Sequence, residues 1–394
     1  MKIAISGAGV AGPALAFWLH KLGHEPTLIE QAPQFRTGGY IIDFWGAGYD
    51  VAERMGILPS VLARGYTVTE VRLVKDDGRR AGGFSAEVFR RMSGGRYTSL
   101  ARGDLAETIY APVRDEVETL FGESVVSIEE TSSDVVVGLA GGSVRHFDFI
   151  VGADGLHSEV RRLVWGEHAR FERPLGYHVA AFECVGYPHR DADVYVSYAE
   201  PGLGISRFAM RDDRTLFLLV FADRHLTAPE PRDDAGRKAA LRAVFGECGW
   251  ETREILDALD RVDEVYFDQV SQIEVPQWSK GRVVLVGDAA ACPSLLAGEG
   301  TGLALTEAYV LAGELQRSGF DLAAGFAAYE ARLRSFLTDK QKSARRFAPS
   351  FAPDTAFGIW LRNQATRLMV IPAVADFLVG SGIRDDLDLP RYDM

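Results

Sequence analysis

The sequence predicts an α/β fold in three parts: a Rossmann-like nucleotide-binding domain, an inserted mixed β-sheet domain and a C-terminal helical segment. Three observations support this prediction. A glycine-rich turn joins an apolar run to a helical run at the start of the chain, strand-like runs follow from residue 67, and a long charged helical run lies near the end. The 394 residues, of which 47% are hydrophobic, are enough for two or three domains with a sizeable core.

The first element is a strand over residues 2–6, followed by the turn Gly-Ala-Gly-Val-Ala-Gly at residues 7–12 and a helix over residues 13–22. Gly7 allows the tight turn, Gly9 lets the backbone approach a pyrophosphate, and Gly12 permits close packing of helix against strand. The phosphates then meet the helix N-terminus, where Ala11 lies.

A second strand, over residues 26–30, ends in Glu30. Glu30 lies 18 residues after Gly12, close to the ~20-residue offset at which an acidic residue takes the ribose hydroxyls. We add the adjacent Gln31 to the expected cofactor contacts. Glu30 favours a ribose without a 2′-phosphate. Together these residues predict nucleotide binding without deciding between FAD and NAD, and a plain tight turn is the alternative.

A loop at residues 36–40 and a helix over residues 51–58 follow, and the pattern then changes. In residues 68–74 a strand would place Val71 and Leu73, with Thr69, on one face and Glu70 and Arg72 on the other, which suits a sheet with one wet face. After a turn at residues 76–78, the sheet is expected to continue between residues 177 and 221, in strands such as 194–198 and 215–220.

This alternation predicts a discontinuous domain organisation. The nucleotide-binding domain comprises residues 1–66, 98–175 and 275–340, the inserted domain comprises residues 67–97 and 176–274, and the C-terminal segment comprises residues 341–394.

Between the two inserted pieces the chain returns to the first pattern. Residues 104–117 are helical in pattern despite Pro112, and residues 124–128, 134–137 and 147–151 are strand-like. The last strand leads directly into Gly-Ala-Asp-Gly at residues 152–155, and a helix begins at residue 158. A plain strand-to-helix connection, in which Asp154 stabilises the turn, would also explain this segment.

A third motif follows late in the chain. Residues 282–286 form a strand-like run that is apolar after Arg282, which is typical of a strand covered on both faces, and Gly287 and Asp288 come next. The stretch Gly-Glu-Gly-Thr-Gly at residues 298–302 then precedes a helical run. A buried strand with a capped helix after it is the alternative.

The three motifs, in this order, resemble the class A FAD-dependent aromatic hydroxylases of the para-hydroxybenzoate hydroxylase type, and the match covers most of residues 1–340. The resemblance implies that the first domain binds FAD and that NADPH or NADH is the co-substrate. It implies that Asp154 and Gly155 serve FAD and the nicotinamide, and that Asp288 accepts a hydrogen bond from a ribityl hydroxyl. It also implies flavin contacts near Arg102 and at the helix start formed by Gly298, Gly300, Thr301 and Gly302.

The chain departs from this family's pattern at three positions. Ala291 and Leu295 stand where the family has histidine and proline, and Glu299 stands where glutamine is common. Residues 39–43 and 278–283 are most similar to the antibiotic-modifying branch, which includes tetracycline-inactivating monooxygenases. We infer no substrate from that likeness.

The resemblance implies a chemistry in which NADPH or NADH reduces FAD, oxygen adds to form a flavin C4a-hydroperoxide, and an oxygen atom passes to an aromatic or polyketide-like small molecule. No catalytic residue is assigned. His178, His189 and Tyr198 are candidates for a base, although structural roles explain such residues more often. The alternatives are a flavin-binding protein without its own turnover and a nicotinamide-dependent dehydrogenase.

Composition limits the class of partner. A net charge of −12 disfavours nucleic acid or an anionic membrane, so we expect a small-molecule partner and infer no oligomeric state. Strand-forming sequence begins at residue 2, which predicts a cytoplasmic protein without a signal peptide. Cys184, Cys248 and Cys292 are widely spaced, which indicates reduced thiols rather than a disulfide framework or a metal site.

A charged helix is expected over residues 326–346, followed by an apolar stretch over residues 357–378. Arg362, Arg367, Pro372 and Asp376 interrupt that stretch, so it predicts no membrane span. It is either a lid over the substrate pocket or a helix packed on the FAD domain.

Overall fold

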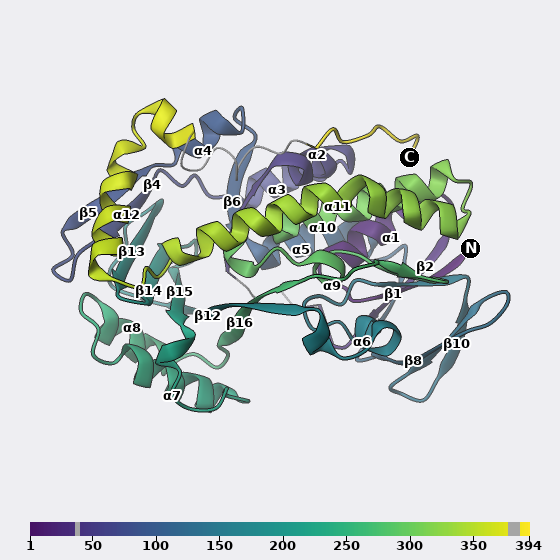
Figure 1. Ribbon diagram of the computed structural model, residues 1–394, viewed down its shortest axis with the longest axis horizontal. Helices are drawn as coiled ribbons and strands as arrows, with labels where there is room; N and C mark the ends of the chain where they lie inside the picture. The colour runs from purple at the N-terminus through teal and green to yellow at the C-terminus, as the bar shows by residue number, and fades with distance from the viewer. Residues whose placement is uncertain (36–39, 377–386) are drawn as a thin grey trace.

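The computed structural model describes residues 1–35, 40–376 and 387–394, and two large sheets organise the fold (Figure 1). The first sheet has six strands, of which five are parallel and β17 is an antiparallel edge. In spatial order the strands are β17 (Ser279–Lys280), β18 (Val283–Leu285), β11 (Phe149–Gly152), β1 (Lys2–Ser6), β2 (Glu25–Glu30) and β7 (Glu118–Phe121).

The register of this sheet brings the ends of four strands together. Ser6, the last residue of β1, lies opposite Gly152 at the end of β11 and opposite Ile29 near the end of β2. Gly152 in turn lies opposite Leu285, the last residue of β18. Loops that leave parallel strands at the same edge form the usual ligand crevice of such a sheet.

Layers cover both faces of the first sheet, so β1, β11 and β18 are almost entirely buried. The apolar strand expected at residues 282–286 is β18. Helices α1, α10 and α11 lie on one side, and α6 with a small three-stranded sheet lies on the other (Figure 1). These elements are α1 (Ala11–Lys21), α10 (Gly300–Arg317), α11 (Leu322–Phe347), α6 (Glu159–Trp165), β8 (Val125–Glu130), β9 (Val135–Leu139) and β10 (Val144–Phe147).

The second sheet has seven strands, all antiparallel except the β13–β4 pair. In spatial order they are β16 (Tyr266–Ile273), β12 (Glu172–Val185), β15 (Arg214–Ala222), β14 (Leu203–Ala209), β13 (Val194–Glu200), β4 (Glu70–Val74) and β5 (Arg80–Ser85). Helices α7 (Asp234–Phe245) and α8 (Thr252–Leu259) pack on one face, as Figure 1 shows at its lower left.

The expectation of a wet face on this sheet is wrong. Arg72 of β4 donates hydrogen bonds to Glu70 and to Asp191, and all three side chains are partly buried. Thr69 lies outside the strand. Because these charges are paired, the polar side chains of β4 can lie partly buried beside neighbouring segments instead of facing water.

Two helix predictions need correction. The helix expected over residues 51–58 is in fact the end of α2 (Gly46–Arg54) and the start of α3 (Leu58–Arg64), because Gly56 takes a φ of 76° between them. The helix expected over residues 104–117 is α5 (Arg102–Tyr110) with one 3₁₀ turn, Ala111–Val113, because Pro112 cannot continue the α-helical hydrogen bonds.

The C-terminal helix α12 (Ala356–Leu368) packs on the second sheet rather than on the first domain. A Cβ at Gly82 of β5 would lie 2.6 Å from the Asn363 carbonyl oxygen, and the Thr366 hydroxyl accepts a hydrogen bond from the Gly83 amide. The loop expected at residues 36–40 and the end of the apolar stretch near residue 378 fall largely outside the described residues. In the part of the chain that is described, no helix has the length and apolar character to cross a membrane.

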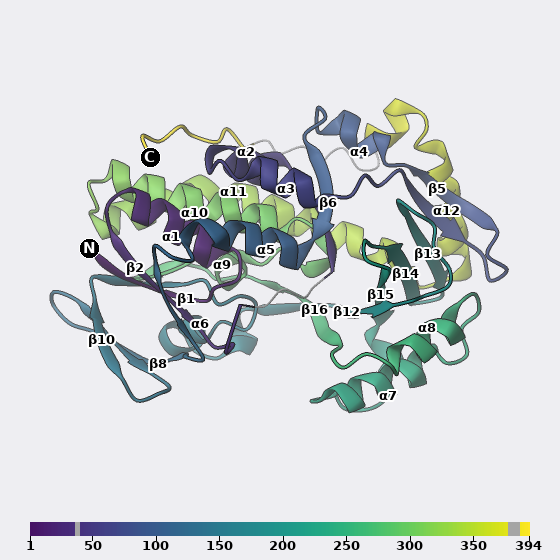
Figure 2. The same cartoon turned by 180° about the vertical axis from the view of Figure 1, so that it is seen from behind.

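A two-stranded ribbon of β3 (Ile41–Trp45) and β6 (Tyr97–Ala101) lies between the two large sheets, as the position of β6 in Figure 2 shows. The short helices α4 (Glu87–Met92) and α9 (Asp288–Ala291) complete the elements. Cys184, Cys248 and Cys292 are free thiols. Residues 1–35, 40–376 and 387–394 contain no cluster of side chains suited to a metal ion.

Candidate functional site

The three sequence motifs meet at the carboxyl edge of the first sheet. A Cβ at Gly7 would lie 2.4 Å from the Ala153 carbonyl oxygen, so the first loop touches the second. The Cβ of Ala11 lies 3.2 Å from the position a Cβ would take on Gly287, so the start of α1 touches the third. The second and third motifs are joined by fully buried Arg161, which donates a hydrogen bond of 3.0 Å to the Ala289 carbonyl.

The glycines of the first motif differ in the space around them. Gly12 has no room for a side chain, because a Cβ there would lie 1.9 Å from the Gly7 carbonyl oxygen. Gly9 has nothing within 4 Å of its Cβ position, and no side chain caps the first amides of α1. An open concavity beside free helix amides is the arrangement that binds a pyrophosphate.

Glu30 lies beside this concavity at the end of β2. One carboxylate oxygen accepts a hydrogen bond of 2.9 Å from the Ala8 amide, and the other accepts one of 2.9 Å from the Ala32 amide. Each oxygen keeps a further lone pair, so the carboxylate can also accept from ribose hydroxyls. The neighbouring Gln31 is exposed.

Asp154 organises the turn of the second motif. Its carboxylate accepts hydrogen bonds from the Ser158 hydroxyl at 2.5 Å and from the Glu159 and Val160 amides at 2.9 and 3.0 Å. Burial raises the pKa of Asp154, and these hydrogen bonds oppose the shift. Gly155 continues the turn with a φ of 79°. In the structure Asp154 therefore stabilises the turn, which is the alternative that the sequence left open.

Four partly accessible side chains lie near the third motif and the second sheet. Burial is the largest cause of the raised pKa of each of them. They are Tyr40, Asp43, Tyr195 and Asp288. Burial raises the pKa of Tyr40 to about 12.

Arg102 lies at the start of α5. Its positive charge acts on both Tyr40 and Asp288. Within the described residues no carboxylate forms an ion pair with its guanidinium, and its backbone amide donates to the Tyr40 carbonyl at 2.9 Å. A guanidinium placed in this way suits an electron-rich or anionic ligand group.

The segment at residues 298–302 forms a wall beside Asp288. Gly298 takes a left-handed conformation with a φ of 70°, and α10 begins at Gly300, whose Cβ would lie 3.7 Å from an Asp288 carboxylate oxygen. Thr301 is buried, and Gly302 lies so close to Gly48 that a Cβ on Gly48 would be 2.4 Å from its Cα. The N-terminus of α10 is therefore held directly beside Asp288.

Glu307 supports this wall and was not predicted from the sequence. Its buried carboxyl accepts hydrogen bonds of 2.7 Å from the Gly287 amide and 3.0 Å from the Tyr329 hydroxyl. Burial raises its pKa to about 8. A carboxyl at helix position 307 gave no recognisable signal, because the residue it supports is twenty positions away in the chain.

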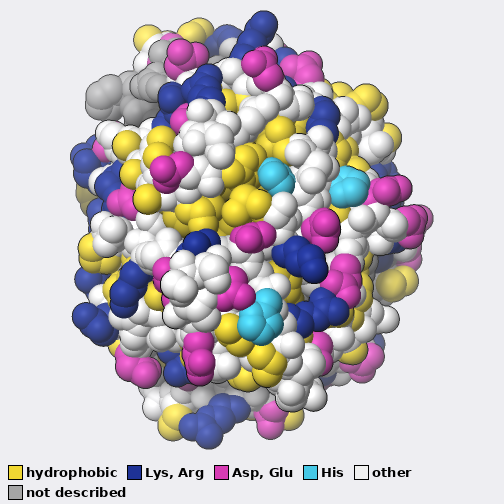
Figure 3. Space-filling view, turned by 90° about the vertical axis from the view of Figure 1, so that its right-hand side faces the viewer, with side chains coloured by type: hydrophobic (Ala, Val, Ile, Leu, Met, Phe, Trp, Pro, Cys, Tyr) yellow, Lys and Arg dark blue, Asp and Glu magenta, His cyan; other side chains and the backbone are white. Residues whose placement is uncertain are grey.

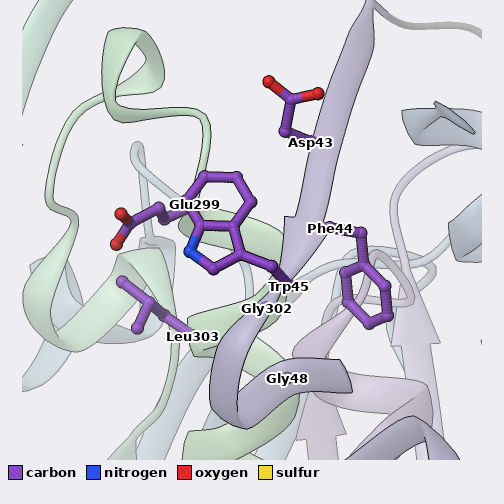
Figure 4. Close-up of a pocket in the computed structure, with 7 residues that line it drawn as sticks. All are labelled: Asp43, Phe44, Trp45, Gly48, Glu299, Gly302 and Leu303. Carbon is purple, nitrogen blue, oxygen red and sulfur yellow. The ribbon is translucent and has the colours of Figure 1, made fainter. Parts of the chain in front are cut away.

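Asp43 was also missed. The Tyr97 and Ser99 hydroxyls donate to one of its oxygens at 2.5 and 2.6 Å. Figure 4 shows Asp43 and Trp45 on the side of β3 that meets the start of α10, around a hollow with room for about one water molecule, about 10 Å³. The signal that could have identified it is a single carboxylate within the apolar run of residues 41–45.

The three base candidates lie elsewhere. His178 and Tyr198 belong to the face of the second sheet that packs on α7 and α8. The His178 ring stacks on Phe221 and its Nδ1 lies 2.9 Å from an Asp223 carboxylate oxygen, and the Tyr198 hydroxyl donates to Glu200. His189 packs against the Tyr187 ring. These contacts are those of structural residues.

Comparison with known proteins agrees with this geometry. A family model described as FAD binding domain matches residues 1–320. An uncharacterised protein of Mycobacterium tuberculosis is 36% identical over 359 residues, which cover 89% of this chain and 94% of that protein. A flavin-dependent monooxygenase of Legionella longbeachae is 32% identical, covering 92% of this chain and 88% of that enzyme.

Solved structures extend the likeness. The crystal structure of the tetracycline destructase Tet(55) superposes with a TM-score of 0.83 at 30% identity, covering 99% of this chain and 98% of that one. Klebsiella pneumoniae HpxO, complexed with FAD and uric acid, shares the fold with a TM-score of 0.78 at 22% identity, covering 96% and 97% of the two chains. The chain therefore belongs to the FAD-binding-domain family and is an FAD-dependent monooxygenase of the class A hydroxylase type.

Proposed function

We propose that this enzyme hydroxylates an aromatic or polyketide-like small molecule with NADPH or NADH and oxygen. The observation that carries the proposal is the meeting of the three motifs beside Arg102, whose charge acts on both Tyr40 and Asp288. The Tyr40 ring lies beside the Tyr266 ring, with ring centres 6.0 Å apart. A planar, largely apolar ligand suits such aromatic side chains.

Bound FAD would supply the oxygen-activating chemistry. The chain itself supplies the cradle at Gly9, the carboxylate of Glu30 for the ribose, and the Asp288 and Arg102 side chains beside the α10 N-terminus.

We further propose that Asp43 accepts the proton of a substrate hydroxyl. Tyr97 and Ser99 donate to one carboxylate oxygen and fix its orientation. The other oxygen has no hydrogen-bond partner within the described chain and belongs to a side chain that lines the hollow. Burial raises the pKa of Asp43, which makes the carboxylate a stronger base than an exposed aspartate.

The distribution of charged side chains on one face of the molecule favours a small molecule over a macromolecular partner there. On the face shown in Figure 3, Lys and Arg side chains alternate with Asp and Glu side chains instead of gathering into one field. A single-sign field is the usual feature of a surface that binds nucleic acid or an anionic membrane.

The test is a substrate screen with purified protein. A flavin absorbance spectrum is expected, together with NADPH or NADH oxidation that accelerates when a substrate is added and a product heavier by one oxygen atom in mass spectrometry. Phenols, quinones and polyketides form the panel, and tetracyclines belong to it because the Tet(55) relative is a tetracycline destructase. Nicotinamide oxidation that no panel compound accelerates would favour the flavin-binding protein without turnover. Colourless protein that does not take up FAD would favour a dehydrogenase.

A further inference from the structure

Two buried side chains of opposite charge meet beside the start of α10. The Lys340 ammonium, from the C-terminal part of α11, lies 2.8 Å from a carboxylate oxygen of Glu299, and the two side chains are only 7% and 14% exposed. Exposed ion pairs contribute little and are common, whereas a buried charge must be matched to be tolerated. The burial of this ion pair therefore indicates that the start of α10 needs both the ammonium and the carboxylate.

Glu299 is the residue immediately before α10. The next residue, Gly300, has its Cβ position 3.7 Å from the Asp288 carboxylate, and Glu299 lines the same small hollow as Asp43. In Figure 4 the Glu299 side chain extends beside the Trp45 indole. A carboxylate at this position opposes the positive end of the α10 dipole, which would otherwise favour negative charge in the hollow.

Lys340 is held in place by its own helix. The neighbouring Gln341 donates hydrogen bonds of 2.7 Å to the Ile273 carbonyl and 3.1 Å to the Cys292 carbonyl, and the Gln272 amide donates to the Gln341 carbonyl at 2.8 Å. These bonds fix α11 to β16 and to the segment after α9. The ammonium is therefore positioned by the scaffold.

We propose that Lys340 neutralises Glu299, so that the N-terminus of α10 can stabilise the negative charge of reduced FAD, and that this pair sets the reduction potential of the flavin. Lys340 is thus a positioning residue that acts through Glu299. The inference rests on the proposed function only in placing the flavin ring beside α10. It assigns a role to the position where the chain has glutamate in place of the more common glutamine.

The test compares four holoenzyme variants: Lys340→Met, Glu299→Gln, the double variant and Lys342→Met. Lys342 is the matched control, because its pair with Asp339 lies on the same helix at 2.9 Å with both side chains more than half exposed. The measurements are the midpoint potential of bound FAD, by equilibration with a redox dye, and the dissociation constant of oxidised FAD.

Lys340→Met removes a positive charge 2.8 Å from the Glu299 carboxylate and is expected to lower the potential. The ratio of reduced to oxidised FAD should fall about tenfold at a fixed dye potential, which corresponds to about 30 mV for two electrons. Glu299→Gln is expected to raise the potential, and the double variant to return close to the wild-type value. Lys342→Met is expected to have no effect.

Opposite signs for the two single variants separate charge from packing. Shifts of the two single variants in the same direction, or a wild-type potential in Glu299→Gln, would overturn the proposal. If Lys340→Met does not fold, as judged by thermal melting, Glu299→Gln and the double variant still decide the sign. Protein that binds FAD with unchanged potentials refutes this inference alone, whereas protein that binds no FAD refutes the proposed function.

Discussion

The glycines of the first motif make separable predictions about folding and cofactor binding. Gly12→Ala places a Cβ 1.9 Å from the Gly7 carbonyl oxygen, where ordinary contacts begin near 3.4 Å, so the turn must move. Overpacking of this kind costs about 1–3 kcal/mol, and we expect the upper end because the clashing atom is backbone. Gly9→Ala meets nothing within 4 Å and should stabilise the apoprotein by about 0.4–1 kcal/mol through the unfolded chain.

Cofactor affinity should show the reverse pattern for Gly9. Its new methyl group occupies the space that we assign to the pyrophosphate, so FAD affinity should fall at least tenfold, about 1.4 kcal/mol. Urea unfolding of the apoproteins and fluorescence titration with FAD measure the two quantities separately. Gly9→Ala with wild-type FAD affinity would refute the assignment of that space to the cofactor. Equal destabilisation by Gly9→Ala and Gly12→Ala would refute the steric reasoning.

Three further predictions concern charged side chains of the site. Burial raises the folded-state pKa of Glu307 from its ordinary value of 4.5 to about 8. The stability present below pH 4.5 is therefore lost as the pH rises towards 8, by at most about 1.4 kcal/mol per pH unit. Urea unfolding at pH 5 and pH 8 should show this slope, and Glu307→Gln, which keeps the acceptor oxygen, should flatten it. Asp43→Asn should lower kcat at least a hundredfold and remove the acidic limb of the pH profile of kcat, because the amide cannot accept a proton. An unchanged acidic limb would exclude Asp43 as the base. Arg102→Gln should weaken FAD binding or slow FAD reduction, and it should change the free energy of unfolding of the apoprotein by no more than about 0.5 kcal/mol. A large loss of stability would show that Arg102 has a structural role instead.

The local sequence was sufficient to predict parts of the first sheet and its first helix. The strand, turn and helix at residues 2–22 are recognisable from hydrophobic periodicity and glycine placement, and the strand β18 from its continuous apolar run. The predicted bounds of the helices near Gly56 and Pro112 were wrong for a local reason as well. Each of these residues ends a helix that the hydrophobic pattern alone would extend.

The hollow was not predictable in the same way. Asp43 meets Tyr97 and Ser99 only because β3 pairs with β6, more than fifty residues further along the chain. Glu307 supports Gly287, and Lys340 reaches Glu299, through tertiary contacts that leave no periodic signal. The polar positions of β4 became enclosed because Asp191, from a loop outside the strand, pairs with Arg72. In each case the deciding partner is distant in sequence.

The carboxyl groups around the site share one electrostatic property. Burial raises the pKa of Asp43, Asp154, Asp288 and Glu307, so the enclosed region disfavours additional negative charge. A dinucleotide brings phosphates and, once reduced, a charged ring into this region. The chain compensates with the helix N-termini of α1 and α10, with Arg102, and with Lys340 balancing Glu299. Because these compensating groups come from four separate elements, cofactor binding should tighten the packing between them, and apoprotein should be less resistant to proteolysis than holoprotein at the α10 and α11 contacts.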